Sequence, residues 1–225
     1  MFDFKRKEIG VVAAFVLIGM FACSMTSEAV EKKSAEGKNR VAVISFQSRA
    51  PEAGQTKTVF CPICKTGAAG GDVLPGSEKI VEEIFMDKLD SIEGIEILPA
   101  EKAQKAYKKI FSGKADHAAA NLQKVGRESG ADFLAVGYVY RYEERVGYKY
   151  SAEHPASVVF EIHLIRTADG RSVWRGSFDK TQKSLMENVL DVFSFFKGGA
   201  QWVTARQLTG LGMDDVFETF PDLQD

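Results

Sequence analysis

The stretch GADFLAVGYVYRYEERV, residues 130–146, contains the longest strand candidate of the chain and decides how its neighbours are interpreted. It begins with four apolar residues, Phe133 to Val136, and continues by alternating tyrosines with Val139, Arg141 and Glu143. A continuous apolar run is typical of a strand buried on both faces, whereas alternation is typical of a strand with one face in water. We therefore predict one strand over residues 131–146 that starts inside the protein and emerges into solvent.

Further strand patterns lie on both sides of this segment. The β-branched run Val41–Phe46 predicts a second buried strand, and other strands are predicted at residues 94–98, 156–166 and 172–178. Within residues 156–166, Phe160 and its apolar neighbours alternate with Glu161 and His163, so the two kinds of side chain face opposite ways. Asp169-Gly170 is a hairpin turn signal between the last two strands.

Helical periodicity fills most of the remaining chain. Helices are predicted at residues 77–89, 101–111, 117–129, 184–197 and 204–217, with Ser77 as the N-cap of the first and Gly130 after the third. Strands alternate with helices early in the chain and pair as hairpins late. This order predicts an α/β fold, a two-layer sandwich whose mixed sheet is covered mainly on one side by helices.

The amino terminus has the organisation of an export signal. Three basic residues at positions 5–7 precede the apolar run Ile9–Ala22, which at 14 residues is shorter than the roughly 20 that a bilayer-spanning helix needs. The run ends in Gly19-Met20-Phe21-Ala22-Cys23, which resembles a bacterial lipobox. That resemblance implies that Cys23 receives a lipid and becomes the new amino terminus.

These patterns divide the chain into three parts. We predict a lipoprotein signal peptide at residues 1–22, a polar flexible tether at 23–39, and a single folded domain at 40–225. Ser24 follows the cysteine where an aspartate would signal inner-membrane retention in enterobacteria, which favours a periplasm-facing position on the outer membrane. The whole chain has a net charge of −2 and no dense basic cluster, so no nucleic-acid partner is expected.

Several segments of the domain resemble a known group of envelope proteins. They are residues 40–46 (RVAVISF), 130–137 (GADFLAVG), 169–174 (DGRSVW), 178–182 (FDKTQ) and 198–202 (GGAQW). Together they resemble bacterial lipoproteins related to the TolB amino-terminal domain and the curli-secretion channel lipoprotein, within a little-characterised subgroup. The resemblance implies an envelope scaffold or partner-binding module, and it assigns no functional residue beyond Cys23.

Three interpretations of the tyrosine-bearing segment follow. An exposed tyrosine-bearing hairpin could contact a protein partner or a second copy of the chain, with Tyr138, Tyr140, Tyr142, Tyr148 and Tyr150 as the candidate surface. The alternative is that these tyrosines simply pack beneath a helix. A third alternative, a subunit of an oligomeric export channel, is weaker because Gly147 to Pro155 lacks the sustained apolar face of a membrane-spanning strand.

The pair Cys61 and Cys64 supplies the main alternative function. Export to an oxidising compartment favours a disulfide between them, while a metal half-site and active redox chemistry remain open. His117, His154 and His163 lie at no ligand-like spacing from the pair, so no complete metal site within one chain is expected. Lys65 also completes Cys-x-x-Cys-Lys, a rare variant of the haem attachment motif.

No recognised catalytic motif accompanies these cysteines. The glycine-rich residues 67–71 lack the Gly-Lys-Ser/Thr ending of a phosphate loop, and no nucleophile elbow or His-Glu-x-x-His helix is present. We therefore expect a protein that is not an enzyme and needs no cofactor.

Overall fold

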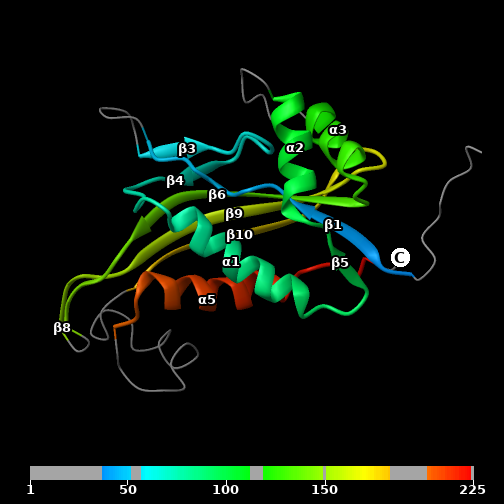
Figure 1. Cartoon of the computed structure of the whole chain (residues 1–225). Coiled ribbons are helices and arrows are strands. Elements are labelled where there is room, and N and C mark those ends of the chain that lie inside the picture. The colour runs from blue at the N-terminus through cyan, green and yellow to red at the C-terminus, as the bar shows by residue number, and fades with distance from the viewer. Residues whose placement is uncertain (1–36, 52–56, 112–118, 149–150, 183–201, 224–225) are drawn as a thin grey trace, which may run out of the picture. The chain divides into compact units, whose positions relative to one another are not determined.

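The domain is built on one mixed β-sheet (Figure 1). The computed structural model describes residues 37–51, 57–111, 119–148, 151–182 and 202–223. Within them the strands of the main sheet run in the order β10-β9-β6-β1-β5, with β2 pairing alongside β6. Their bounds are β1 Asn39–Val43, β2 Gln47–Ser48, β5 Ile95–Ile97, β6 Phe133–Glu143, β9 Ser157–Arg166 and β10 Ser172–Thr181.

Parallel and antiparallel pairing divide this sheet at β6. Strand β1 pairs parallel with both β5 and β6, because helical crossovers separate these strands in the chain. Strands β6, β9 and β10 pair antiparallel, and a turn at residues 167–170 joins the last two. The mixed sheet and the α/β class predicted from the sequence are confirmed.

Helices cover both faces of the sheet, whereas the sequence predicted that they cover mainly one. Helices α1 (Ser77–Asp90) and α5 (Ala205–Phe217) pack on one face, and α2 (Ala100–Ile110) and α3 (Ala119–Ser129) pack on the other (Figure 1). Alternate residues of β1 divide accordingly: Val41 and Val43 enter the first core, whereas Ala42 and Ile44, the residue that follows the strand, enter the second. A strand buried on both faces is what the run Val41–Phe46 predicted.

The helix predictions agree with the structure within a few residues, with one difference in capping. Gly76 in the left-handed region, with φ 85°, is the N-cap of α1, and Ser77 is its first helical residue. Gly130 takes a left-handed φ of 74° after α3, as predicted, and Thr204 caps α5 through the amide of Gln207. The helix predicted at residues 184–197 lies outside the described residues.

The segment between β2 and α1, where the sequence predicted no strand, contains a second, two-stranded sheet. Strands β3 (Thr58–Phe60) and β4 (Gly67–Ala69) form a hairpin that covers the α2/α3 face of the main sheet beside those helices (Figure 1). The amide of Gly71 donates to the Tyr140 carbonyl at 3.0 Å, which fastens the end of the hairpin to β6. A side chain at Gly71 would clash, since a Cβ there would lie 2.6 Å from Arg141.

The long strand predicted at residues 131–146 is interrupted. It ends at Glu143 as β6, and a separate hairpin follows, formed by β7 (Val146–Tyr148) and β8 (Ser151–His154). Among the described residues these two strands pair only with each other. Figure 1 shows them beyond the end of the main sheet.

The prediction that the tyrosines form an exposed surface is wrong for Tyr138, Tyr140 and Tyr142. Tyr138 and Tyr140 are fully buried in the core beneath α2, α3 and the β3–β4 hairpin, and Tyr142 is buried in the core on the opposite face. Tyr140 is the extra residue of a β-bulge against β9, because Val139 and Arg141 pair with the adjacent residues Phe160 and Val159. The bulge reverses the alternation, which no hydropathy pattern signals. Tyr148 remains exposed, and Tyr150 lies outside the described residues.

Candidate functional site

The turn between β3 and β4 holds both cysteines of the domain in a tight knuckle. Cys61 closes the turn with two backbone hydrogen bonds, donating to Thr66 at 2.9 Å and accepting from Lys65 at 3.0 Å. Lys65 has a φ of 62°, the left-handed conformation that lets the chain reverse after the second cysteine. The Ile63 amide also points at the Cys61 sulfur, with N and Sγ 3.4 Å apart. The Cys61 side chain is fully buried in the core beneath the turn.

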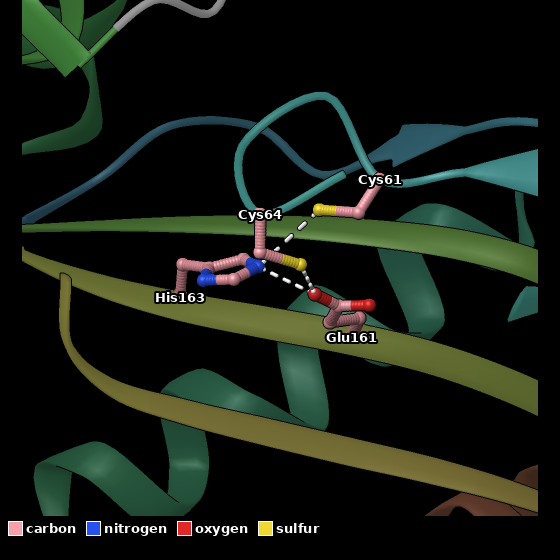
Figure 2. Close-up of side chains that lie close together, drawn as sticks. All are labelled: Cys61, Cys64, Glu161 and His163. Carbon is pink, nitrogen blue, oxygen red and sulfur yellow. Dashed lines mark hydrogen bonds and ion pairs between the residues drawn. The ribbon is translucent and has the colours of Figure 1, made fainter. Parts of the chain in front are cut away.

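Strand β9 places two polar side chains directly beneath this knuckle. Glu161 and His163 are two residues apart, so the pleat points both to the same face, while Phe160 and Ile162 point to the other core. His163 Nε2 lies 2.5 Å from Glu161 Oε1 and 3.3 Å from Cys61 Sγ, and Cys64 Sγ lies 3.1 Å from Glu161 Oε1 (Figure 2). One donor atom from each residue lies within 4.8 Å of the other three.

We name Cys61, Cys64, Glu161 and His163 the CEH cluster. Three of its members are almost completely enclosed, since Cys61, Glu161 and His163 are at most 1% exposed, whereas Cys64 is exposed to solvent. Buried ionisable groups are costly unless they are paired or coordinate a metal. The enclosure of three such groups together therefore calls for a compensating charge.

Part of that charge comes from β10. Arg175 pairs with His163 in the sheet register and reaches across to Glu161, where Nε donates to Oε1 at 2.9 Å and Nη2 to Oε2 at 3.2 Å. The other ring nitrogen of His163, Nδ1, lies 3.2 Å from the hydroxyl of Ser172. The cluster thus has an outer set of partners that holds its carboxylate and imidazole in place.

Burial and hydrogen bonding act in opposite directions on the two acids of the cluster. Burial raises the pKa of the Cys61 thiol to about 11, although the backbone amides of Cys64 and Ile63 oppose it. Burial also raises the pKa of Glu161, but hydrogen bonds from His163, Arg175 and Cys64 outweigh it and hold that pKa at about 2. Glu161 is therefore a carboxylate, and Cys61 is a thiol as long as no cation lies beside it.

The structure brings together residues that the sequence treated separately. His163 joins the cysteine pair despite a separation of about 100 residues, and Glu161, which the sequence did not mark as a ligand, supplies a fourth donor. The expectation that one chain offers no complete ligand set is therefore wrong for the described residues. The available signal was a pair of ionisable residues, Glu161 and His163, on alternate positions of a strand that is otherwise apolar.

The other predicted site residues have different outcomes. Both thiols of the knuckle are free in the structure, and the predicted disulfide between Cys61 and Cys64 stays a prediction. Lys65, the residue in the position of a haem ligand, donates to the Pro62 carbonyl of its own turn at 2.9 Å. Cys23 lies outside the described residues. Among those that are described, no helix combines the length and apolarity needed to cross a bilayer.

Comparisons with known proteins find only distant likeness. No protein-family model matches the chain, and no curated protein matches it. The PelC dodecamer from Paraburkholderia phytofirmans is similar at 14% identity over 81% of this chain and 86% of that chain, with a TM-score of 0.44. Lipoprotein GNA1162 from Neisseria meningitidis is similar at 13% identity, 70% and 93% coverage, and a TM-score of 0.41. LpoB from Escherichia coli is similar at 12% identity over 65% of this chain and 59% of that chain, with a TM-score of 0.40.

A likeness at this level carries no argument about function or partners. The TolB-related and curli-related subgroup suggested by the sequence therefore stays a prediction.

Proposed function

We propose that this protein is an exported lipoprotein, anchored by a lipid on Cys23, whose folded domain binds or assembles other proteins of the cell envelope. The anchor is supported by the lipobox-like residues 19–23 after a basic and apolar leader, and by the polar tether that follows. Ser24 supports an outer-membrane, periplasm-facing position. In this arrangement the tether lets the domain meet partners within reach of the membrane surface.

One structural observation carries the partner-binding part of this proposal: the β7–β8 hairpin exposes apolar side chains. Tyr148 is 84% exposed and Val146 is 49% exposed. A two-stranded hairpin that pairs only with itself is marginal in water, so aromatic and branched residues left in solvent on it are poorly explained by folding alone. An exposed tyrosine supplies a large contact area at low entropic cost when a partner covers it.

A redox activity of the cysteine pair fits the geometry less well. Thiol oxidoreductases place the reactive cysteine at a helix amino terminus, whereas Cys61 and Cys64 both lie in a turn between two strands. A haem attached at this motif would need the Cys61 sulfur to reach a vinyl group from beneath the hairpin. These contacts favour a binding module over a redox protein.

The decisive experiment is site-specific crosslinking in membranes of the native host. A photoreactive amino acid replaces Tyr148 on the hairpin in one strain and exposed Lys102 on α2 in the other. The proposal expects a discrete crosslinked product from position 148, either with a second copy of the chain or with another envelope protein, and none from position 102. No product from 148, or the same products from both positions, would overturn hairpin-mediated binding.

The lipid anchor has its own test. Replacing Cys23 with serine removes the only sulfur that can accept the lipid at this site. The variant is expected in the soluble envelope fraction, whereas the wild type stays with the membranes. A Cys23→Ser protein that remains membrane-bound would contradict lipid anchoring.

A further inference from the structure

We propose that the CEH cluster is a binding site for one divalent metal ion of the zinc class, which ties the β3–β4 hairpin to the central sheet. This goes beyond partner binding and does not depend on it. The ligands would be the sulfurs of Cys61 and Cys64, Nε2 of His163 and a carboxylate oxygen of Glu161. Two sulfurs, one imidazole and one carboxylate are ligand types that zinc accepts, and the sulfurs disfavour magnesium and calcium.

The distances match a tetrahedral site after small side-chain adjustments. Bonds of about 2.3 Å to sulfur and about 2.0–2.1 Å to nitrogen or oxygen place neighbouring ligand atoms roughly 3.3–3.8 Å apart. The contact between Cys61 and His163 is 3.3 Å and that between Cys64 and Glu161 is 3.1 Å. The His163–Glu161 contact of 2.5 Å has to open, which one rotation of the Glu161 side chain on its strand can provide.

The inner nitrogen of His163 is placed where a metal ion could bind it. Nε2 lies 2.5 Å from Glu161 Oε1 and 3.3 Å from Cys61 Sγ, so it points at two other members of the cluster. Without a metal ion, His163 donates to the carboxylate through this nitrogen, and a bound ion would take the place of that proton. Nδ1 lies 3.2 Å from Ser172 Oγ, which donates to the Trp174 carbonyl and can accept from a protonated Nδ1.

Outer contacts of the cluster are those of a metal site. Metal-bound histidines usually donate a hydrogen bond from their second nitrogen to a fixed acceptor, and Ser172 Oγ stands in that position 3.2 Å from His163 Nδ1. Two thiolates, the Glu161 carboxylate, the Arg175 guanidinium and one divalent ion together carry no net charge, which suits an enclosed site. The hydroxyl of Tyr140 is buried near Cys61, and among the described residues no acceptor lies at both the distance and the angle of a hydrogen bond to it. A Cys61 thiolate would give it an acceptor.

The metal would have a structural role. The β3–β4 hairpin is three residues long on each side, too short for independent stability, yet it covers buried Tyr138 and Tyr140. Two ligands come from its turn and two from β9, so the ion joins segments about 100 residues apart and would exclude hairpin opening. Four protein ligands leave no open position for substrate, in keeping with a structural site. Exposed Cys64 provides the route by which the ion enters.

Cobalt(II) titration of the full-length protein tests this assignment. The protein is exported in its host, purified in detergent, reduced, stripped with a chelator and titrated with cobalt(II) and then zinc(II). One cobalt per chain is expected, with visible d–d bands and a thiolate charge-transfer band, both abolished by one equivalent of zinc. If the purified protein contains a Cys61–Cys64 disulfide, its mass is lower by two hydrogens, and the titration is made after reduction.

Two variants identify the ligands. Cys64→Ser changes an exposed side chain and should fold, and it is expected to weaken cobalt binding by at least about tenfold and to reduce the charge-transfer band. His154→Ala removes an exposed histidine outside the cluster and should bind as the wild type does. Reduced wild-type protein that takes up no cobalt, or takes it up without a thiolate band, overturns the proposal, as does a Cys64→Ser protein with unchanged affinity. In those cases the CEH cluster is a buried ion pair beneath a thiol turn.

Discussion

Replacing Arg175 with methionine should destabilise the domain by more than most single substitutions at partly exposed residues do. Arg175 holds both oxygens of Glu161, at 2.9 and 3.2 Å, and Glu161 is only 1% exposed. Removing one partner of a buried ion pair costs roughly 3–5 kcal/mol, because the other charge is left without compensation. Arg175 is itself 39% exposed, and His163 and Cys64 still contact the carboxylate. We therefore expect a loss of about 2 kcal/mol.

This loss is measured by thermal and denaturant unfolding of the full-length protein in detergent, with a chelator present so that metal plays no part. For a domain of this size about 2 kcal/mol corresponds to a fall in Tm of roughly 4–8 °C. Arg171→Met, which alters an exposed arginine in the turn before the same strand, should change stability by less than about 0.5 kcal/mol. Adding Glu161→Gln to Arg175→Met should restore part of the loss, since the buried charge is then gone. An Arg175→Met protein as stable as the Arg171→Met control would refute this account of the charges.

Three further changes test the fold around the site. Gly137→Ala would place a Cβ 2.5 Å from ring atoms of buried Phe46 and should cost roughly 1–3 kcal/mol in denaturant unfolding, so a neutral result would contradict the packing of β6. Burial raises the pKa of Asp132, but hydrogen bonds from Arg40 outweigh it and leave that pKa below its usual range. Because a lowered carboxyl pKa stabilises the fold above the unfolded pKa, Asp132 should give an advantage over Asp132→Asn of about 1 kcal/mol at pH 7. That advantage should begin to fall below about pH 4 and vanish once the pH is below the lowered pKa of the folded protein, and a constant advantage would contradict this pairing. Thr204→Ala removes the cap of α5 and should cost about 1 kcal/mol, detected as a lower denaturant midpoint, with Thr204→Ser as the conservative control.

The sequence was informative wherever local patterns decide the structure. Apolar residues of the run Val41–Phe46 face the two cores in turn, and the β-branched apolar composition of the run predicted a strand that is buried on both faces. Gly130 follows the end of α3 in the left-handed conformation, and Thr204 caps the start of α5 with its side chain. Both roles depend on the type of a single residue, so they can be recognised in the sequence. The hairpin of β9 and β10 follows equally from alternation and a turn signal.

Features that depend on distant contacts were missed. The glycines at 70 and 71 were read only as part of a glycine-rich segment without a phosphate-loop ending, but a Cβ at Gly70 would lie 2.7 Å from Val59 of β3 and one at Gly71 would lie 2.6 Å from Arg141 of β6. The bulge at Tyr140 is fixed by pairing with β9 and has no local signature. The CEH cluster was missed for the same kind of reason, since only a hairpin folded over β9 brings Cys61 to His163.

The most direct test of the proposed function is the intact mass of the full-length protein recovered from membranes of its native host. The account predicts a chain that begins at Cys23, increased in mass by a diacylglycerol group and an amide-linked acyl chain on the cysteine. A chain that retains residues 1–22, or one that carries an unmodified Cys23, would contradict the proposal that this domain is held at the membrane by lipid.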